Sequence, residues 1–586
     1  MPITPTYPGV YIEEVPSGVR TITGVATSIT AFVGRTMRGP TNEARRIASF
    51  GDFQSVFGGL WEKSSLGFSV RDFYANGGSE AYIVRLYRAE PGEQPDTFRP
   101  NFAKLEIPTD DNNNALRLIA RSEGAWGNNL RARVEYPPPT IAEAAASILG
   151  LDSANADRLF NLLVRDTRTG DTEQFQNVTV AESPRRVDRV LESGSRLVRV
   201  EQLPSPSDPT DPASVPPRPL EHLPPPQPPA PPGSAIRPPR RDVWSDRYDP
   251  AVAGDVDTNV KVADDAQASD GINLMDEDFI GDGKEASKQG LFALDKTDLF
   301  NLLCIPPYLD PPGIDDPDVS PELISAAAGY CEKRRAMLLV DAPRSWRSVE
   351  DAEGDPTANP PTGVAGVGTR SKNAAVFFPR LRQPNPLRNN FVEEFVPSGA
   401  VAGVFARTDT QRGVFKAPAG LEAGLANVRQ LSVSLTDPEN GRLNPKGVNS
   451  LRAMPAVGPV VWGARTLQGD DRLASEWKYI PIRRLALYME ESLYRGTQWV
   501  VFEPNDEPLW AQIRLNVGAF MHNLFRQGAF QGASARDAYF VKCDGETTTQ
   551  NDRNLGIVNI LVGFAPLKPA EFVIIKIQQI AGEIET

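Results

Sequence analysis

The feature that most strongly limits how this chain folds is a proline-rich tract at residues 204–239. It holds 16 prolines in 36 positions, including the run PPPQPPAPP. Proline fixes φ and has no backbone N–H, so this stretch cannot join a helix or a sheet. We expect an extended, solvated linker, continued by an acidic, loosely ordered segment to about residue 288. A ligand for an SH3-type domain is the alternative reading of the same composition.

Length and charge limit the remaining possibilities. The chain has 586 residues, a formal net charge of −13 and 40% hydrophobic residues, which predicts about three or four folded domains. An acidic protein lacks the basic face that nucleic acid requires, so we expect no nucleic-acid partner. No apolar run is long enough to insert into a bilayer, and the first residues lack the pattern of a secretion signal. We therefore expect assembly in the cytoplasm.

Cysteine and histidine are too sparse to indicate a metal or cofactor site. The three cysteines, Cys304, Cys331 and Cys543, are far apart in the sequence and form no C-x-x-C pair. Of the two histidines, His222 lies in the proline-rich tract and His522 in a helical pattern. We expect buried thiols, no metal and no cofactor.

Strands and helices alternate on both sides of a central interruption. Residues 21–100 predict a buried strand, two capped helices and a second strand, and residues 291–475 resume the same alternation. The segments AMLLVDAP and KNAAVFFPRL are continuous apolar runs of the kind that is buried on both faces of a sheet. This pattern predicts an open, largely parallel αβ sheet.

Two further units complete the predicted organisation. Residues 101–200 read as a β-rich insertion with two strands joined by a turn at residues 124–129, a hairpin, and a helix followed by a strand. Residues 476–569 read as two amphipathic helices followed by two strands, an α+β unit.

Both ends of the chain carry strand patterns without an evident partner. The C-terminal arm, residues 570–586, contains FVIIKI, in which Val573, Ile575 and Ile577 face one side and Phe572 and Ile574 the other. Unpaired, such a strand promotes aggregation.

The N-terminal arm, residues 1–20, shows the same alternation in Val10, Tyr11, Ile12 and Glu13. The residues alone leave open whether the two arms pair within their own chain or with another.

Many segments agree with one known family. Long ones are LNPKGVNSLRAMPAVGPVVWGARTL, WKYIPIRRLALYMEESLYRGTQWVVFEPNDEPLWAQI and VGFAPLKPAEFVIIKIQQ; shorter ones are YPGVYIEE, FVGRTMRGP, FYANGGSEAYIVR, GAWGNNLRARV, LFNLLCIPP and RGVFKAPAG. Together they closely resemble the contractile tail sheath proteins, which build the outer sheath of contractile phage tails and of phage-tail-like injection particles. The resemblance covers most of the chain outside the proline-rich tract and its acidic continuation.

The resemblance implies a multidomain fold of mixed α/β class. Its parts would be a subtilisin-like central αβ domain, an inserted β-rich outer domain and a C-terminal α+β inner domain with extended strand arms. The implied division is 1–20 N-terminal arm, 21–100 first part of the core, 101–200 outer domain, 201–290 linker, 291–475 central domain, 476–569 inner domain and 570–586 C-terminal arm.

The resemblance also implies a function. Sheath subunits stack as six-fold rings around an inner tube, donate their arms to neighbouring subunits, and contract to drive the tube through a target envelope. Expected partners are further copies of the chain, the tube, the baseplate, terminator proteins and sheath paralogues. Arg514 and Arg526 are candidate contacts to the tube, although a salt-bridging face within the sheath would explain them equally well. The kind of particle, phage tail, bacteriocin or injection system, stays open.

Two other functions are consistent with parts of the sequence. A non-contractile tube or capsid subunit would also assemble, but tube proteins are much shorter. A subtilisin-like core raises the possibility of a hydrolase, which requires Ser, His and Asp in contact. Neither histidine lies in a fitting context, and the loop GVAGVGTR, residues 363–370, lacks the lysine of a phosphate loop. We therefore expect no enzymatic activity.

Overall fold

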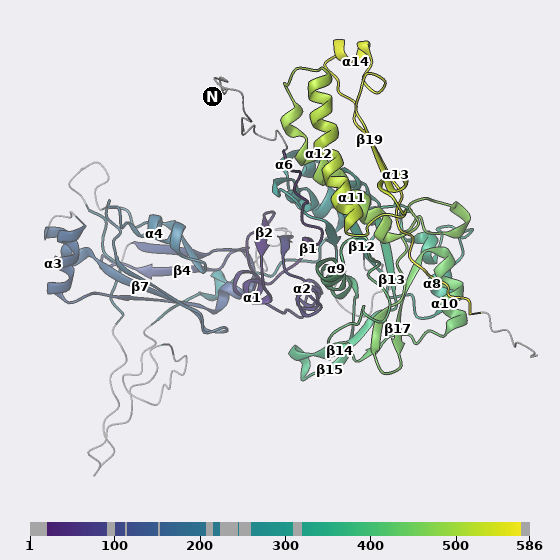
Figure 1. Cartoon of the computed structure of the whole chain (residues 1–586). Helices are drawn as coiled ribbons and strands as arrows, with labels where there is room; N and C mark the ends of the chain where they lie inside the picture. Colours follow the sequence, from purple (N-terminus) through teal and green to yellow (C-terminus); the bar gives the residue numbers. More distant parts are fainter. Residues whose placement is uncertain are drawn as a thin grey trace, which may run out of the picture.

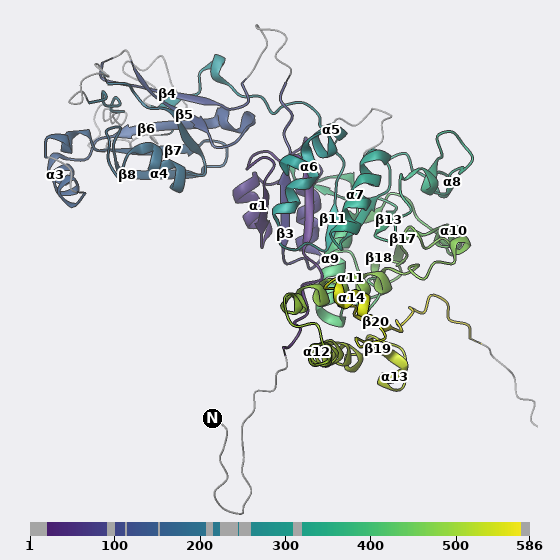
Figure 2. The same cartoon turned by 90° about the horizontal axis from the view of Figure 1, so that it is seen from above.

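The computed structural model describes residues 20–90, 100–111, 114–149, 153–206, 215–222, 244, 259–308 and 319–575. These residues form a central body, an inserted unit that extends to one side and a C-terminal unit (Figure 1). Seen from above, the inserted unit and the C-terminal unit again lie on different sides of the central body (Figure 2).

The central body is built on an eight-stranded sheet with the order β18-β17-β13-β12-β11-β1-β3-β2. Its inner strands pair in parallel, and the edge strands β2 and β18 are antiparallel to their neighbours. The strands are β1 (Thr30–Gly34), β2 (Ala44–Ile47), β3 (Ala81–Arg85), β11 (Leu302–Cys304), β12 (Met337–Asp341), β13 (Ala374–Phe378), β17 (Val448–Met454) and β18 (Gly458–Val461). The predicted parallel sheet is confirmed, and it joins both halves of the chain through β1 and β11.

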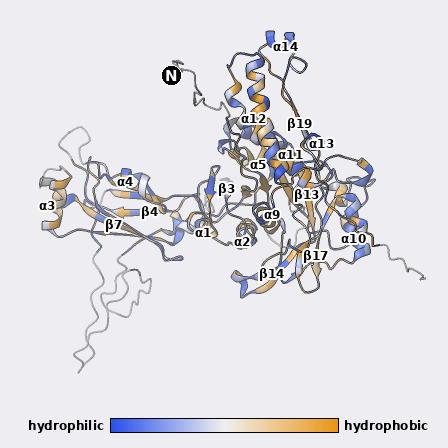
Figure 3. Cartoon of the chain, viewed as in Figure 1, coloured by the Kyte–Doolittle hydropathy of each residue, from blue (hydrophilic) through white to orange (hydrophobic). Residues whose placement is uncertain are grey.

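Helices cover both faces of this sheet because its central strands are apolar on both sides, as the hydrophobic colour of the central body reflects (Figure 3). One face packs against α1 (Phe50–Phe57), α2 (Leu66–Ala75) and α9 (Ser398–Arg412). The other packs against α5 (Asp276–Ile280), α7 (Pro321–Lys333), α8 (Val349–Glu353) and α10 (Asp437–Leu443). The short α6 (Lys284–Ser287) follows α5, and a small sheet of β14 (Leu381–Asn385), β15 (Phe391–Phe395) and β16 (Gln430–Leu431) extends the body.

The inserted unit contains two sheets around a core of its own, with the strand orders β4-β5-β9 and β10-β6-β7-β8. Its elements are β4 (Lys104–Pro108), β5 (Ala115–Ala120), β6 (Leu130–Glu135), α3 (Pro139–Ile148), β7 (Phe160–Asp166), β8 (Thr172–Val178), α4 (Val187–Gly194), β9 (Val198–Gln202) and β10 (Val260–Lys261). The predicted β7–β8 hairpin is confirmed. The strands on either side of residues 124–129 exist, but they belong to different sheets.

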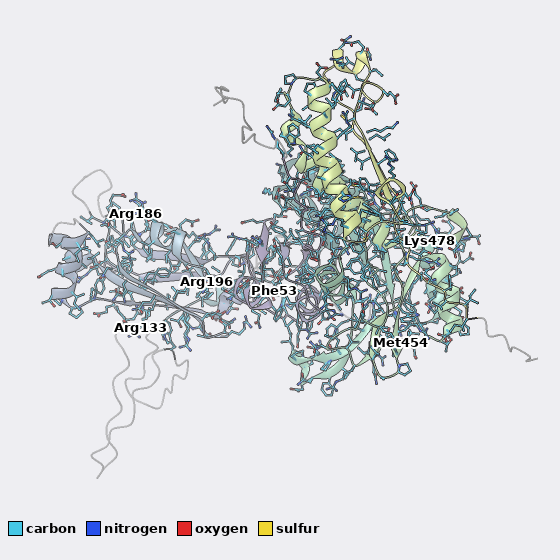
Figure 4. All side chains as sticks on the ribbon, viewed as in Figure 1. Phe53, Arg133, Arg186, Arg196, Met454 and Lys478 are labelled. Carbon is cyan, nitrogen blue, oxygen red and sulfur yellow. The ribbon has the colours of Figure 1, made fainter. Side chains whose placement is uncertain are left out.

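Polar contacts attach the inserted unit to the central body. The fully buried Arg85 donates to Glu123 Oε2 at 2.8 Å, and Thr41 donates to the same oxygen at 2.8 Å. Arg196 donates to Ser55 Oγ at 2.8 Å near Phe53, at the junction of the two parts (Figure 4).

The C-terminal unit packs two long helices against a two-stranded sheet. Its elements are α11 (Ile480–Gly496), α12 (Glu507–Arg526), α13 (Ala535–Ala538), β19 (Tyr539–Lys542), α14 (Gln550–Asn554) and β20 (Leu561–Phe564). The predicted helices are confirmed. The second predicted strand is shorter than the apolar run LGIVNILVGFAP suggests, because pairing with β19 spans four residues.

The prediction of a loosely ordered acidic segment up to residue 288 is wrong for residues 259–288. In this stretch β10 pairs with β6, and α5 and the residues before it pack on the central sheet through the buried Phe279 and Leu274. Single apolar residues spaced among acidic ones anchor the segment, a pattern that average composition hides.

The prediction of a solvated linker is likewise wrong for residues 215–222. The backbone N–H of Leu220 donates to Pro108 O, and that of His222 to Val134 O, each at 2.8 Å. Leu220 and His222, which unlike proline have a backbone N–H, thus attach part of the tract to the inserted unit.

Glycines let α9 approach α2 closely. A Cβ on Gly403 would collide with the carbonyl oxygen of Phe73, and one on Gly399 with that of Ser69. In contrast, a Cβ on Gly518 in α12 would meet no atom within 4 Å.

We therefore expect Gly403→Ala to destabilise the fold by about 1–3 kcal/mol, because backbone must move to admit the methyl group. Gly518→Ala is the matched control and should stabilise it by about 0.5–1 kcal/mol through helix propensity alone. Denaturant unfolding of the unassembled protein measures both. Equal shifts of the two variants would contradict the close packing of α2 and α9.

Candidate intersubunit connectors

The C-terminal arm begins with four consecutive exposed apolar side chains. Phe572, Val573, Ile574 and Ile575 are 75%, 82%, 81% and 79% exposed. Among the described residues none of the four pairs with a strand of its own chain. The fifth predicted arm residue, Ile577, and the N-terminal arm residues Val10, Tyr11, Ile12 and Glu13 lie outside the described residues. Their contacts with another subunit stay predictions.

Immediately before this run, Glu571 is held by a buried arginine. Arg465 is 1% exposed, and its guanidinium donates to both carboxylate oxygens of Glu571, at 2.8 and 2.6 Å. Tyr479 donates its hydroxyl to Glu571 at 3.2 Å, and Asp471 accepts from Arg465 at 3.0 Å. We call Arg465, Asp471, Tyr479 and Glu571 the clamp. Lys478 marks its side of the central body, opposite the inserted unit (Figure 4).

The clamp is fixed to the central sheet through Asn449 of β17. The Asn449 side chain accepts from the backbone N–H of Arg465 at 2.7 Å and donates to its carbonyl at 2.7 Å. The same amide donates to Val376 O in β13 at 3.1 Å. Because Asn449 is fully buried, Arg465 has little freedom to move relative to the sheet.

Electrostatics keep Glu571 ionised. Burial alone would raise the pKa of its carboxyl, but the hydrogen bonds and positive charge of Arg465 outweigh burial and lower the pKa below its ordinary value of 4.5. Lys478, which donates to Asp471, also lowers the pKa of Glu571, and burial raises the pKa of Tyr479.

The first described residues of the chain lie against the C-terminal unit. Residues 20–29, which we call the strap, run along α11. The Arg20 N–H donates to Asn516 at 3.1 Å, Ile22 enters the core of the C-terminal unit, and the Val25 N–H donates to Ser492 at 3.2 Å. Gly496, the last residue of α11, has no room for a Cβ beside Ile22. The strap therefore places the start of the N-terminal arm on this unit.

Helix α11 connects the two arm roots. Tyr479 of the clamp directly precedes the first turn of α11, and Ile22 of the strap contacts Gly496 at the end of the helix. At 17 residues the helix is about 25 Å long. The sequence contains no local signal for the strap or the clamp. The strap residues bind partners up to 496 positions away, and Arg465 and Glu571 are 106 positions apart.

The sheet of β19 and β20 offers unpaired edges close to these roots. It has two strands, and among the described residues no third strand joins it. Phe540 and Leu561, which lie on its strands, are 50% and 52% exposed. A two-stranded sheet is marginal by itself, so additional strands would stabilise it.

The two candidate tube contacts on α12 differ in their surroundings. Arg514 forms an ion pair with Glu507 at 2.6 Å and also donates to Cys543 O, so its charge is used within the subunit. Arg526, in the last turn of α12, is exposed. A contact of either residue to a tube stays a prediction.

The two histidines lie in different units. His222 accepts from the Val134 N–H at 3.2 Å in the inserted unit, and burial together with Arg133 lowers its pKa. His522 lies on α12 beside Phe525. A Ser–Asp pair does occur in the central body, where Ser398 donates to Asp341 through both N–H and Oγ at 2.7 Å. There Asp341 accepts the N–H of the first residue of α9, as a helix-capping group does.

Sequence and structure comparisons place these features in a family. Residues 474–580 match the family model described as the phage tail sheath C-terminal domain. This part of the chain is therefore similar to the C-terminal domain of phage tail sheath proteins. It contains α11, α12, the β19–β20 sheet and the described start of the C-terminal arm. The chain has no match among curated protein sequences.

The sheath resemblance extends to the whole fold. The helical sheath of the anti-feeding prophage in its contracted state aligns with 22% identity and a TM-score of 0.51, over 98% of this chain and 100% of that one. The sheath complex of the PVC extracellular contractile injection system, also contracted, aligns with 19% identity and a TM-score of 0.51, over 98% of each chain. A sheath tail protein from Listeria innocua aligns with 10% identity and a TM-score of 0.52, over 93% and 96% of the two chains.

The predicted resemblance to contractile tail sheath proteins is therefore confirmed, and the mixed α/β fold matches that of sheath proteins. Separately, none of the described helices combines the length and apolar character of a bilayer-crossing segment.

The clamp should open in acid. Because the pKa of Glu571 is lowered in the folded protein, its stabilising contribution is present above pH 4.5 and is lost as pH falls through the lower, folded value. A nitroxide on Phe572→Cys reports this, since the three native cysteines are buried. We expect restricted motion at pH 7 and increased mobility in acid.

Adding Glu571→Gln to the labelled protein provides the control. Its nitroxide should be mobile at every pH, so the difference between the two proteins should vanish in acid. A pH-independent difference would mean that Glu571 does not hold the arm.

Proposed function

We propose that the chain is the structural subunit of a contractile sheath. Copies stack as six-fold rings around an inner tube, and contraction of the sheath drives the tube through a target envelope. The partners are further copies of the chain, the tube protein, the baseplate and terminator proteins, with sheath paralogues as additional lattice members. The particle assembles in the bacterial cytoplasm and acts as a phage tail or phage-tail-like particle.

The observation that carries this proposal is the exposed run from Phe572 to Ile575 within a chain that has a sheath fold. Four adjacent apolar residues with unpaired backbone groups form an edge that promotes aggregation unless another strand covers it. Addition of this strand to a neighbouring subunit satisfies the backbone groups and buries both faces. The arm thereby becomes the connector between subunits.

The β19–β20 sheet of a neighbouring copy is the receiving surface that fits this arm. It has free edges, its Phe540 and Leu561 are half exposed, and it gains stability from added strands. The strap supports the same role for the N-terminal arm, because it delivers the arm root to the C-terminal unit of its own subunit.

The three parts of the chain correspond in this proposal to layers of the sheath. The C-terminal unit is the inner layer, with the exposed Arg526 directed to an acidic tube surface. The central body is the subtilisin-like core of the family, and the inserted unit lies on the outside. The exposed Ile148 on α3 then belongs to the outer surface.

Contraction requires no cofactor in this mechanism. The extended lattice is metastable and relaxes to a shorter and wider one when a baseplate signal releases it. Energy is stored in the packing between subunits, and motion occurs at hinges that flank the arms. Pro16–Gly18 and Gly563–Pro569 are the proposed hinges. The first lies outside the described residues. The second begins inside β20, at Gly563, and ends before Glu571, so it can move only once Glu571 is released.

The double substitution Val573→Asp, Ile575→Asp tests the connector. Both side chains are exposed in the subunit, so the melting temperature should stay within about 1–2 °C of the original, because such surface changes cost little free energy. Assembly should be lost, because a neighbour would have to bury two carboxylates. Negative-stain electron microscopy counts the tubes, with truncation before Ala570 as a second, independent loss of the arm.

Ile148→Asp is the matched control. It places one such charge on an equally exposed isoleucine of the inserted unit, and tubes should form normally. Normal tubes from the arm variants would refute strand donation, whereas loss of tubes in all variants would point to general sensitivity to surface charge.

A further inference from the structure

The position of Glu571 between an attached segment and a free one has a mechanical consequence. The last backbone hydrogen bonds of the C-terminal unit involve Ala565, which donates to Ala538 O and accepts from Gln531 N–H, both at 2.8 Å. Beyond the bridge of Pro566 to Phe530, the chain crosses to the central body, and Glu571 attaches it there. The exposed run starts at the next residue.

The attachment is specific rather than a loose surface pair. Two parallel hydrogen bonds join the guanidinium to the carboxylate, which fixes distance and orientation together. The remaining Arg465 donor group is also satisfied, by Gly469 O at 3.2 Å and Asp471 at 3.0 Å. Arg465 is fully buried and hydrogen-bonded to Asn449 of the central sheet. The position of the arm root is therefore fixed by the central sheet and not by the β19–β20 sheet, from which the chain arrives.

We infer that the clamp positions the C-terminal arm, so that Arg465 and Glu571 determine which surface of a neighbouring subunit the arm can reach. This inference rests on the proposed donation of the arm. Release of Glu571 would free residues 567–571 and add about 16 Å of extended chain before the arm strand. A longer tether lowers the effective concentration of the strand at its receiving site and admits other sites.

Arg465 and Glu571 are thus positioning residues. A role limited to folding would change the stability of the subunit but not the place where the arm binds. A positioning role changes the place of binding in a subunit that still folds. The experiment must therefore measure separately where the arm binds on a neighbouring subunit and how stable the subunit is.

Photo-cross-linking from position 574 provides the first readout. A benzophenone amino acid replaces the exposed Ile574 in the full chain, assembled tubes and unassembled protein are irradiated, and the partner peptides are identified by mass spectrometry. We expect one main inter-chain partner segment in the parent protein. With Glu571→Gln the yield of that cross-link should fall about five-fold or more, and cross-links to other segments should appear.

Matched variants separate position from charge and from folding. Glu583→Gln removes the same charge further along the arm, and Arg472→Gln removes an exposed arginine of the same loop; both should keep the parent cross-link. Arg465→Lys keeps the charge but loses the two-bond geometry, so it should resemble Glu571→Gln. Thermal unfolding of each variant supplies the second readout, and Glu571→Gln should remain folded at the temperature of assembly, because Asp471 still pairs with Arg465.

The outcomes are distinct. Identical cross-link maps for the parent and Glu571→Gln would overturn the positioning role while leaving arm donation intact. Absence of any inter-chain cross-link in parent tubes would overturn arm donation, and the positioning role with it. A shifted map from a variant that remains folded is the result expected from the clamp.

Discussion

The buried ion pair between Arg484 and Asp409 holds together the parts on which the rest of the structure depends. Both side chains are at most 4% exposed, and the guanidinium donates to the two carboxylate oxygens at 2.8 and 2.6 Å. Thr27 of the strap completes the group, since its carbonyl accepts from Arg484 and its hydroxyl donates to Asp409. Breaking one side of such a pair costs about 3–5 kcal/mol, because the remaining charge stays buried. One interaction therefore fixes α9 of the central body, α11 of the C-terminal unit and the strap relative to each other.

The inserted unit is attached in a different way. It has its own core, and Arg85–Glu123 and Arg196–Ser55 connect it to the body at the start of the sheet. Such an arrangement lets the outer part change without disturbing the central sheet, whereas α11 cannot change independently of either neighbour. The molecule thus combines one rigid frame, formed by the central sheet, α11 and the strap, with a peripheral unit that has a core of its own.

Local patterns predicted the parts that depend on local physics. Continuous apolar strands such as β12 and β13 indicated the parallel sheet, and Ser49 and Ser320 cap the predicted helices. Helix α5 was not predicted because the segment is acidic overall. Burial of only two apolar side chains, Leu274 and Phe279, is enough to order it. Helix α3 was missed although Pro139 at its start and four alanines favour a helix, because only Ala142 and Ala146 are buried and the apolar pattern is weak. The clamp and the strap could not be predicted, since Arg465 and Glu571 are 106 positions apart and nothing near either residue indicates the other. The exposed arm was visible in the sequence, but its root was not.

The two arm roots lie at opposite ends of one helix, and this geometry bears on how a sheath of such subunits would contract. A pull on the C-terminal arm reaches Glu571 and passes through Arg465 and Asn449 into the central sheet. A pull on the N-terminal arm passes through Ile22 and the strap to α11, and through Arg484–Asp409 to the same sheet. Both forces end in one rigid frame, so the subunit would keep its internal structure while its neighbours move. Under the proposed function, as long as the clamp holds, the change of lattice would be confined to the chain beyond the roots, where no buried contact of the subunit has to break.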